Sequence, residues 1–255
     1  MLKFRLDSGR PLIARVFASG LYDLLDNWRV RPHRFDEFEP VRRPWEDRDS
    51  FLHQCEHNCR QPFGVVIVKW RDPRLSLMLI FEHGPASQCH SLVLSGSSKK
   101  GFGGESAPWL VELADTLFDF LGMDYGFACH RDEFEESNMQ TTPIAGVEGG
   151  CSIQAVGMNW PDCIPGLYWC NFFGDAYFEQ GFGSRIEEWA GTTKLRRGVR
   201  LMRSPSPETW RGDDDRLASE HLRSLLGPDW FFSKSQGMPA RALRTDKSAF
   251  RIGSR

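Results

Sequence analysis

Apolar residues recur at spacings of three and four along several segments of the chain, and this spacing predicts amphipathic helices. The first helix is expected over residues 12–28. The second is expected over residues 107–121, where Gly122 follows as a C-cap. Shorter helices are expected at residues 47–59, 177–178, 184–189 and 215–226. Helices therefore occur in both halves of the chain.

Short apolar segments between turn-forming residues predict strands. They cover residues 64–70, 75–81, 89–94, 123–130 and 166–173, while residues 194–196 and 198–202 predict a hairpin. The connections between the first three are too short for parallel crossovers, so these strands are expected to be antiparallel. The order of elements predicts an α+β fold in which helices pack on one face of a mainly antiparallel sheet.

Glycine, serine, threonine and proline concentrate in two segments that are expected to be loops, residues 97–106 and 141–150. We expect residues 1–255 to form one α+β domain. Two lobes joined near residues 141–150 are the alternative. The tail from Gln236 shows little apolar periodicity and is expected to be partly irregular.

The overall charge balance argues against nucleic acid as a partner. The formal net charge is −2, and basic residues cluster only in short pairs such as Arg196-Arg197, whereas a nucleic-acid-binding domain usually carries a basic stripe. No apolar run approaches the roughly 20 residues that cross a bilayer, so no membrane association is expected. The odd count of 7 cysteines and the absence of an N-terminal signal segment predict a cytoplasmic location.

The common enzyme signatures fail on specific positions. The segment from Gly96 to Gly101 has the glycine spacing of a phosphate-binding loop, but Phe102 stands where that loop requires lysine. The sequence contains neither a nucleophile elbow nor a zinc-binding His-Glu-x-x-His helix. No catalytic residue and no cofactor is therefore assigned.

One histidine and cysteine cluster is a candidate metal site. On a helix His53 and His57 lie one turn apart, as do Cys55 and Cys59, and such pairs can bind zinc. The two pairs face in widely different directions, however, because two helical residues rotate by about 200°. One helix cannot close a four-ligand site, so His53 and His57 remain weak candidates and we expect no metal.

Acidic residues form two runs that could steer a basic partner toward the surface. Solvated faces or helix-start charges are the alternative interpretation. The residues proposed for the rim of a partner-binding surface are Glu133, Glu135, Glu136, Asp213, Asp214 and Asp215.

The most informative segment is Gly166-Leu-Tyr-Trp-Cys-Asn-Phe-Phe-Gly174. Both of its alternating faces are largely apolar, which predicts a central strand covered on both sides. Asn171 would be a buried amide that needs hydrogen-bond partners, and we expect it to hold the Phe173-Gly174 turn. The motif residues to which we assign a structural role are Gly166, Tyr168, Trp169, Asn171, Phe173 and Gly174.

This segment, with the following Asp175-Ala-Tyr-Phe178, resembles a motif of immunity proteins in bacterial polymorphic-toxin and type VI secretion systems, in particular the immunity protein 52 family. The region around Arg34 and the order of Gly198–Leu201, an amphipathic helix and Gly227–Phe232 are also similar to that family. The resemblance implies an immunity protein that binds a cognate toxin without catalysis. It implies no catalytic residues and does not locate the binding face.

The leading hypothesis is therefore a toxin-neutralising immunity protein whose partner is the cognate toxin protein. One alternative is a metal-dependent hydrolase built on His53 and His57. A second alternative is an adaptor subunit of a secretion or phage-like assembly. The sequence leaves the toxin, the interface and the oligomeric state open.

Overall fold

A computed structural model describes residues 2–8, 14–71, 74–84, 87–96, 106–144, 150–156, 163–177 and 183–234 of the chain. Ten strands form one sheet in the order β11-β12-β10-β7-β1-β6-β5-β4-β2-β3, and β8 and β9 form a separate two-stranded ribbon. Every pairing within these two sheets is antiparallel. The predicted α+β class with a mainly antiparallel sheet is confirmed.

Most of the longer strands coincide with short segments that are apolar or that alternate between apolar and polar residues. They are β1 (Leu2–Ser8), β2 (Arg34–Asp36), β3 (Arg43–Pro44), β4 (Phe63–Trp70), β5 (Leu75–Gly84), β6 (Ser87–Gly96), β7 (Tyr125–His130), β8 (Met139–Pro143), β9 (Cys151–Ala155), β10 (Cys170–Gly174), β11 (Thr192–Leu195) and β12 (Gly198–Met202). The helices are α1 (Ala14–Asp26), α2 (Arg48–Cys59), α3 (Ser106–Leu121), α4 (Arg131–Asn138), α5 (Asp175–Tyr177), α6 (Gly183–Glu187) and α7 (Asp213–Leu226). The 3-10 turns η2 (Pro207–Thr209) and η3 (Pro228–Trp230) flank α7.

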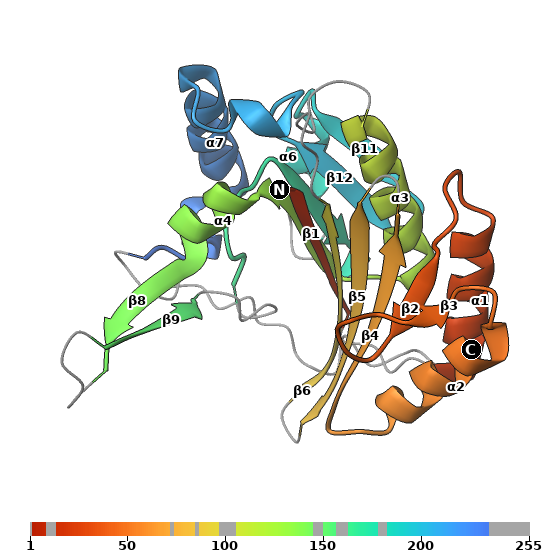
Figure 1. The fold of residues 1–255 in the computed structure, drawn as a ribbon. Coiled ribbons are helices and arrows are strands. Elements are labelled where there is room, and N and C mark those ends of the chain that lie inside the picture. The colour runs from red at the N-terminus through yellow and green to blue at the C-terminus, as the bar shows by residue number, and fades with distance from the viewer. Residues whose placement is uncertain are drawn as a thin grey trace.

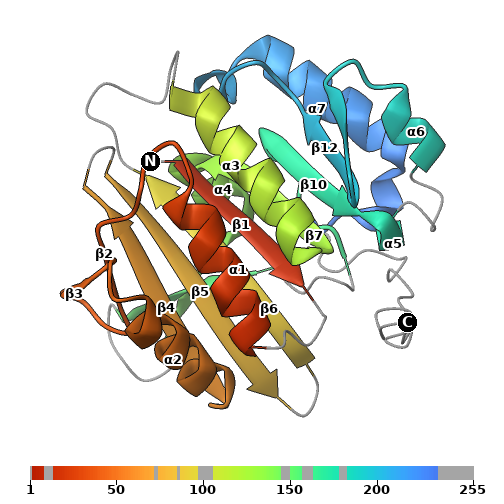
Figure 2. The ribbon, with the colours of Figure 1, turned by 90° about the vertical axis from the view of Figure 1, so that its right-hand side faces the viewer.

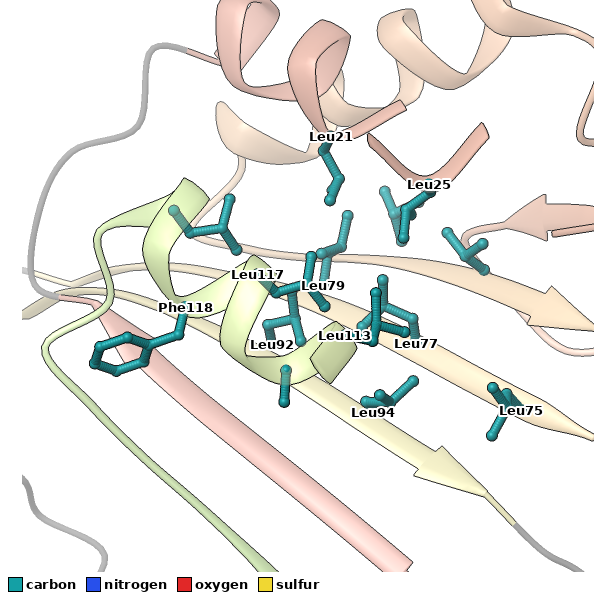
Figure 3. Packing of buried hydrophobic residues seen from close by; sticks show 14 of the residues in the cluster. Leu21, Leu25, Leu75, Leu77, Leu79, Leu92, Leu94, Leu113, Leu117 and Phe118 are labelled. Atoms are coloured by element: carbon teal, nitrogen blue, oxygen red, sulfur yellow. The ribbon is translucent and has the colours of Figure 1, made fainter. Parts of the chain in front are cut away.

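Helices α1, α2 and α3 pack side by side on one face of the sheet, as expected (Figure 2). Their apolar stripes meet leucines that alternate along β5 and β6, because every second residue of a strand points to the same side. This first core includes Leu21, Leu25, Leu77, Leu79, Leu92, Leu94, Leu113, Leu117 and Phe118 (Figure 3). Asp47 caps α2 by accepting a hydrogen bond from the Ser50 backbone N–H, and Gly122 follows α3 with a positive φ of 60°.

The opposite face carries a second core, which covers β7, β10 and β12. Helices α4, α6 and α7 and the segment from Ile164 to Tyr168 contribute residues to it. The second core consists of Tyr125, Phe127, Cys129, Phe134, Ile164, Leu167, Tyr168, Phe173, Tyr177, Ile186, Val199, Leu201, Leu222, Leu226 and Phe231. Helical covering is thus not restricted to one face in the β7–β12 half of the sheet.

Sequence reasoning missed β1, which lies between β6 and β7 in the middle of the sheet. Apolar and charged residues alternate along Leu2–Ser8, and this period of two is itself a strand signal. The segment pairs with β6 and β7 along nearly its whole length. The N-terminal segment is therefore integral to the sheet.

Several predicted elements differ from the structure by a few residues at their ends, and two of these differences change the interpretation of a segment. Residues 141–143, which were expected to be part of a loop, belong to β8. The predicted strand over residues 166–173 is regular only from Cys170, although residues 166–169 are also buried. The remainder of the predicted 97–106 loop before Ser106, and the tail from Gln236, lie outside the described residues.

Candidate protein-binding surface

The face of β4, β5 and β6 opposite the first core is only partly covered. Along β5, Leu75, Leu77 and Leu79 are buried under α1–α3, whereas the alternate residues Met78 and Ile80 are half-buried. Within the described part of the chain no helix lies over this side of the three strands (Figure 1). Met78 and Ile80 are therefore partly accessible to solvent, whereas Ile67 and Ser91 on the same side are buried.

The strand register makes the apolar residues on this side of the sheet neighbours. Val65 pairs with Ile80, and Met78 lies between Ile67 on β4 and Val93 on β6. Directly opposite residues of an antiparallel pair point to the same side and contact each other. We call this patch the open face and define it by Phe63, Val65, Ile67, Met78, Ile80 and Val93.

The open face has one strongly exposed aromatic residue at its end. Phe63, the first residue of β4, is 61% exposed, whereas Ile67 near the middle of the patch is only 6% exposed. Polar residues lie beyond the other end, where Lys69 pairs with Ser76 and Ser76 with Ser95. An apolar centre with a polar border and an exposed aromatic side chain is typical of a protein-binding surface.

The open face continues the side of the sheet that the second core covers elsewhere. Phe127 of β7 lies in the same row as Val93, with the backbone of Arg5 in β1 between them. Phe127 is fully buried, because Phe134 and Tyr168 stack on its ring, with centroids 6.0 Å and 4.1 Å away. The second core thus covers the β7–β12 half of this side, whereas the described residues cover the open face in the β4–β6 half only partly.

Two of the six predicted rim acids are buried and belong to the fold instead. The Arg203 guanidinium contacts Glu133 Oε1 at 2.7 Å, Asp215 Oδ1 at 2.8 Å and Asp215 Oδ2 at 2.6 Å. Glu133 and Asp215 are each 3% exposed, so neither can lie on a solvent-exposed rim. The assignment of these two residues to a binding surface was wrong, because a buried carboxylate requires a charged or hydrogen-bonding partner and Arg203 supplies it.

Burial is the largest influence on the pKa values of Glu133 and Arg203 in this group of three residues. It raises the pKa of Glu133 to about 7, and the nearby Arg203 charge only partly opposes that rise. Burial would lower the pKa of Arg203, but Glu133 and Asp215 together raise it, so the guanidinium stays charged. Glu133 Oε2 is buried without a partner within hydrogen-bond distance in the part of the chain that the structure describes, although the His130 backbone also lowers the pKa of this carboxyl group.

The raised pKa of Glu133 predicts the sign of a pH effect. The folded protein keeps the Glu133 proton up to about pH 7, while the ordinary pKa of a glutamate side chain is 4.5. Because the folded state binds the Glu133 proton more tightly than the unfolded state does, this proton stabilises the fold. The stabilisation is complete below pH 4.5 and is lost as the pH rises to about 7. We expect Glu133→Gln to reduce the fall in unfolding free energy across this range by up to about 1 kcal/mol per pH unit.

Urea denaturation of both proteins at several pH values between about 5 and 7 measures this difference. Glu135→Gln is the matched control, because Glu135 is exposed and pairs with Arg131 at 2.6 Å on the same helix. The control should keep the pH profile of the parent protein. An unchanged profile in Glu133→Gln would contradict the assignment of the proton to this carboxyl group.

The other four acids are exposed, and their role at a partner-facing rim stays a prediction. Glu136 pairs with Arg211, which ties α4 to the turn before α7. Asp213 and Asp214 begin α7, where negative charge is favourable at the helix N-terminus. They help to line a surface hollow of about 580 Å³ beside Arg203 and Thr209.

The weak metal candidates His53 and His57 are both exposed on α2. Cys55 is buried, and burial raises the pKa of its thiol far above the usual range, which disfavours the thiolate that binds zinc. In the described residues no three His, Cys, Asp or Glu side chains come together in a way that could hold an ion.

The motif segment has the structural contacts of a core element. Asn171 is buried, and its side chain exchanges two hydrogen bonds with the backbone of Tyr168, accepting at 3.0 Å and donating at 2.8 Å. It therefore holds the turn that precedes β10 rather than the Phe173-Gly174 turn expected from the sequence. The Trp169 indole N–H donates to the Ser204 carbonyl at 2.8 Å.

The glycines of the motif differ in their importance. A Cβ atom on Gly174 would lie 2.8 Å from the Met123 carbonyl oxygen, so the close approach of β10 to the segment before β7 requires glycine there. At Gly166 a Cβ atom would make only ordinary contacts with Tyr168. Tyr168 is 1% exposed and the side chains of Trp169, Asn171 and Phe173 are fully buried. None of these four side chains is therefore available to a partner.

Comparisons with known proteins identify no relative: no family model matches the chain, and neither the curated proteins nor the solved structures contain a match. None of the helices in the described ranges is long and apolar enough to cross a membrane.

Proposed function

We propose that this chain is an immunity protein that neutralises a cognate bacterial toxin by binding it through the open face. The observation that carries the proposal is the partly exposed apolar patch on β4, β5 and β6, on a sheet whose other half is covered on both sides. The resemblance of the Gly166–Gly174 segment to immunity proteins supports the role, although that segment is buried and cannot itself contact the toxin.

The chemistry of the open face indicates what the toxin must present. Apolar or aromatic side chains of the partner would cover Met78 and Ile80, since burial of apolar area is the main favourable term in association. Phe63 would be an anchor residue, because exposed aromatic side chains often dominate interface energies. Glu135, Glu136, Asp213 and Asp214 would act farther away, by raising the rate of encounter with a basic partner.

Co-expression with the product of the neighbouring gene tests the role directly. We expect that product to inhibit growth when expressed alone, and the present chain to restore growth and to co-purify with it. A harmless neighbouring product would contradict the immunity role itself.

Charge substitution tests the surface separately from the role. Met78→Glu places a charge at the centre of the open face, where desolvation in a complex is costly. We expect at least a tenfold increase in the Kd for the toxin, measured by calorimetry, and loss of growth protection. Leu217→Glu is the matched control, because Leu217 on α7 is also an exposed apolar residue, at 55%. If Met78→Glu binds and protects as well as the control does, the toxin binds elsewhere.

A further inference from the structure

The ribbon of β8 and β9 projects away from the sheet and the helices (Figure 1). All of its residues are exposed except Met139, which packs against the second core where the ribbon begins. A two-stranded ribbon without further support is marginally stable in water. The two strands pair only with each other among the described residues.

The hydrogen bonds at the two ends of the ribbon show which backbone groups remain unpaired. Ile144 N donates to Gly150 O at 2.9 Å, and Val156 N donates to Asn138 O at 2.7 Å. Even-numbered residues are therefore in the hydrogen-bonded positions, since bonded and non-bonded pairs alternate along an antiparallel ladder. The N–H and C=O groups of the odd-numbered residues point outward, and on β9 these residues are Cys151, Ile153 and Ala155.

The outer edge of β9 lacks the features that usually prevent strand pairing. Natural edge strands are often blocked by a charged side chain, a proline or a bulge. Pro143 removes one donor from the edge of β8, but β9 contains no proline. Neither strand contains a charged residue. Ile153 is 64% exposed at the centre of the open edge.

We propose that β9 pairs in antiparallel fashion with β9 of a second copy of this chain. Pairing about a twofold axis at Ile153 places Ile153 opposite itself and Cys151 opposite Ala155 of the second copy. All outward N–H and C=O groups of the three residues then find partners in one four-stranded sheet, β8-β9-β9-β8. This proposal is independent of the toxin-binding role.

A second copy fits this edge better than an arbitrary protein strand. The contact is symmetric, so each copy offers the same set of donors and acceptors in the register that the other needs. Because both strands are uncharged, no like charges meet across the axis. The paired segment is short, and we therefore expect a dimer that dissociates on dilution.

Sedimentation analysis of the full chain over a range of concentrations tests the dimer. We expect a concentration-dependent dimer whose dissociation constant rises at least tenfold in Ile153→Lys, because two lysines would then meet at the axis. Leu217→Lys on α7 should dimerise like the parent chain. A parent chain that stays monomeric throughout, or a dimer that Ile153→Lys leaves unchanged, would overturn the proposal.

A covalent trap tests the register without relying on dimer strength. In Ala155→Cys, each new thiol would lie opposite Cys151 of the second copy, and under mild oxidation by air oxygen the two thiols would form a disulfide by losing two electrons and two protons. Within one strand the two positions are about 13 Å apart, too far for a disulfide, so any bond between them joins two copies.

We expect Ala155→Cys to give a covalent dimer on a non-reducing gel, and the dimer to disappear when Cys151 is also changed to serine. Gln154→Cys is the matched control, because residue 154 points to the other side of the ribbon. If Ala155→Cys gives no covalent dimer, or Gln154→Cys gives as much, the proposed pairing is wrong.

Discussion

Replacing Arg203 with methionine is expected to lower the free energy of unfolding by about 3–5 kcal/mol, because the change leaves the buried carboxyl groups of Glu133 and Asp215 without their charged partner. Arg203 is 8% exposed and contacts both Glu133 and Asp215. It also donates to the Leu167 carbonyl, so the variant would leave that backbone group without this donor. Methionine keeps much of the length and the apolar contact of the side chain, and the loss therefore reports mainly on charge and hydrogen bonding.

Urea unfolding monitored by circular dichroism measures this effect. Arg216→Met is the matched control, because Arg216 also forms ion pairs, with Asp213 and Glu220, but its side chain is 64% exposed. Exposed ion pairs contribute little, so the control should change stability by less than about 1 kcal/mol. Equal effects of the two substitutions would show that the Arg203 centre is not a determinant of the fold.

This centre also shows what sequence reasoning could not find. Arg203 and Glu133 are separated by 70 positions, and local patterning contains no information that they meet. The acidic runs were visible in the sequence, but a run of carboxylates has the same appearance whether it is solvated or paired. Only the contacts of Arg203, directly after β12, with α4 and α7 distinguish Glu133 and Asp215 from their exposed neighbours.

The elements with strong periodicity were predictable because a single physical pattern determines each of them. Helix α3 follows its apolar stripe, and β4, β5 and β6 follow apolar runs separated by turn residues. The exposure of one face of these strands was not predictable. Residues 64–68 of β4 are apolar on both alternating faces, a pattern that usually indicates cover on both sides. Whether a helix covers the second face of these strands depends on where the other helices of the chain pack, and the sequence of the strands contains no information about that.

Strand β5 did contain a usable signal in its composition. The residues that face the first core are leucines and Phe81, whereas the alternate positions are Ser76, Met78 and Ile80. A face that mixes serine with flexible and β-branched side chains is less specialised for core packing. Methionine in particular is common on adaptable binding surfaces. This difference between the two faces, rather than overall hydrophobicity, indicates where a partner could bind.

Two phenylalanines separate the structural role of the motif from the proposed binding role. Phe172 of β10 is fully buried in the first core, and its ring centroid lies 5.4 Å from that of Phe118. We expect Phe172→Ala to lower the free energy of unfolding by about 3–5 kcal/mol, because it removes a buried ring and leaves a cavity. Phe63→Ala should change stability by less than about 1 kcal/mol, because Phe63 is 61% exposed.

The order of effects should reverse when binding is measured. Under conditions in which both variants remain folded, Phe172→Ala should keep the Kd of the parent chain for the toxin, since its side chain lies on the covered side of the sheet. Phe63→Ala should raise that Kd at least tenfold, because truncation of an aromatic anchor typically costs more than 1 kcal/mol. Calorimetric binding titrations and urea unfolding of the same two proteins provide the comparison. If both variants lose stability and affinity in parallel, the open face is not a separate binding surface, and the aromatic residues of β4 and β10 serve only the fold.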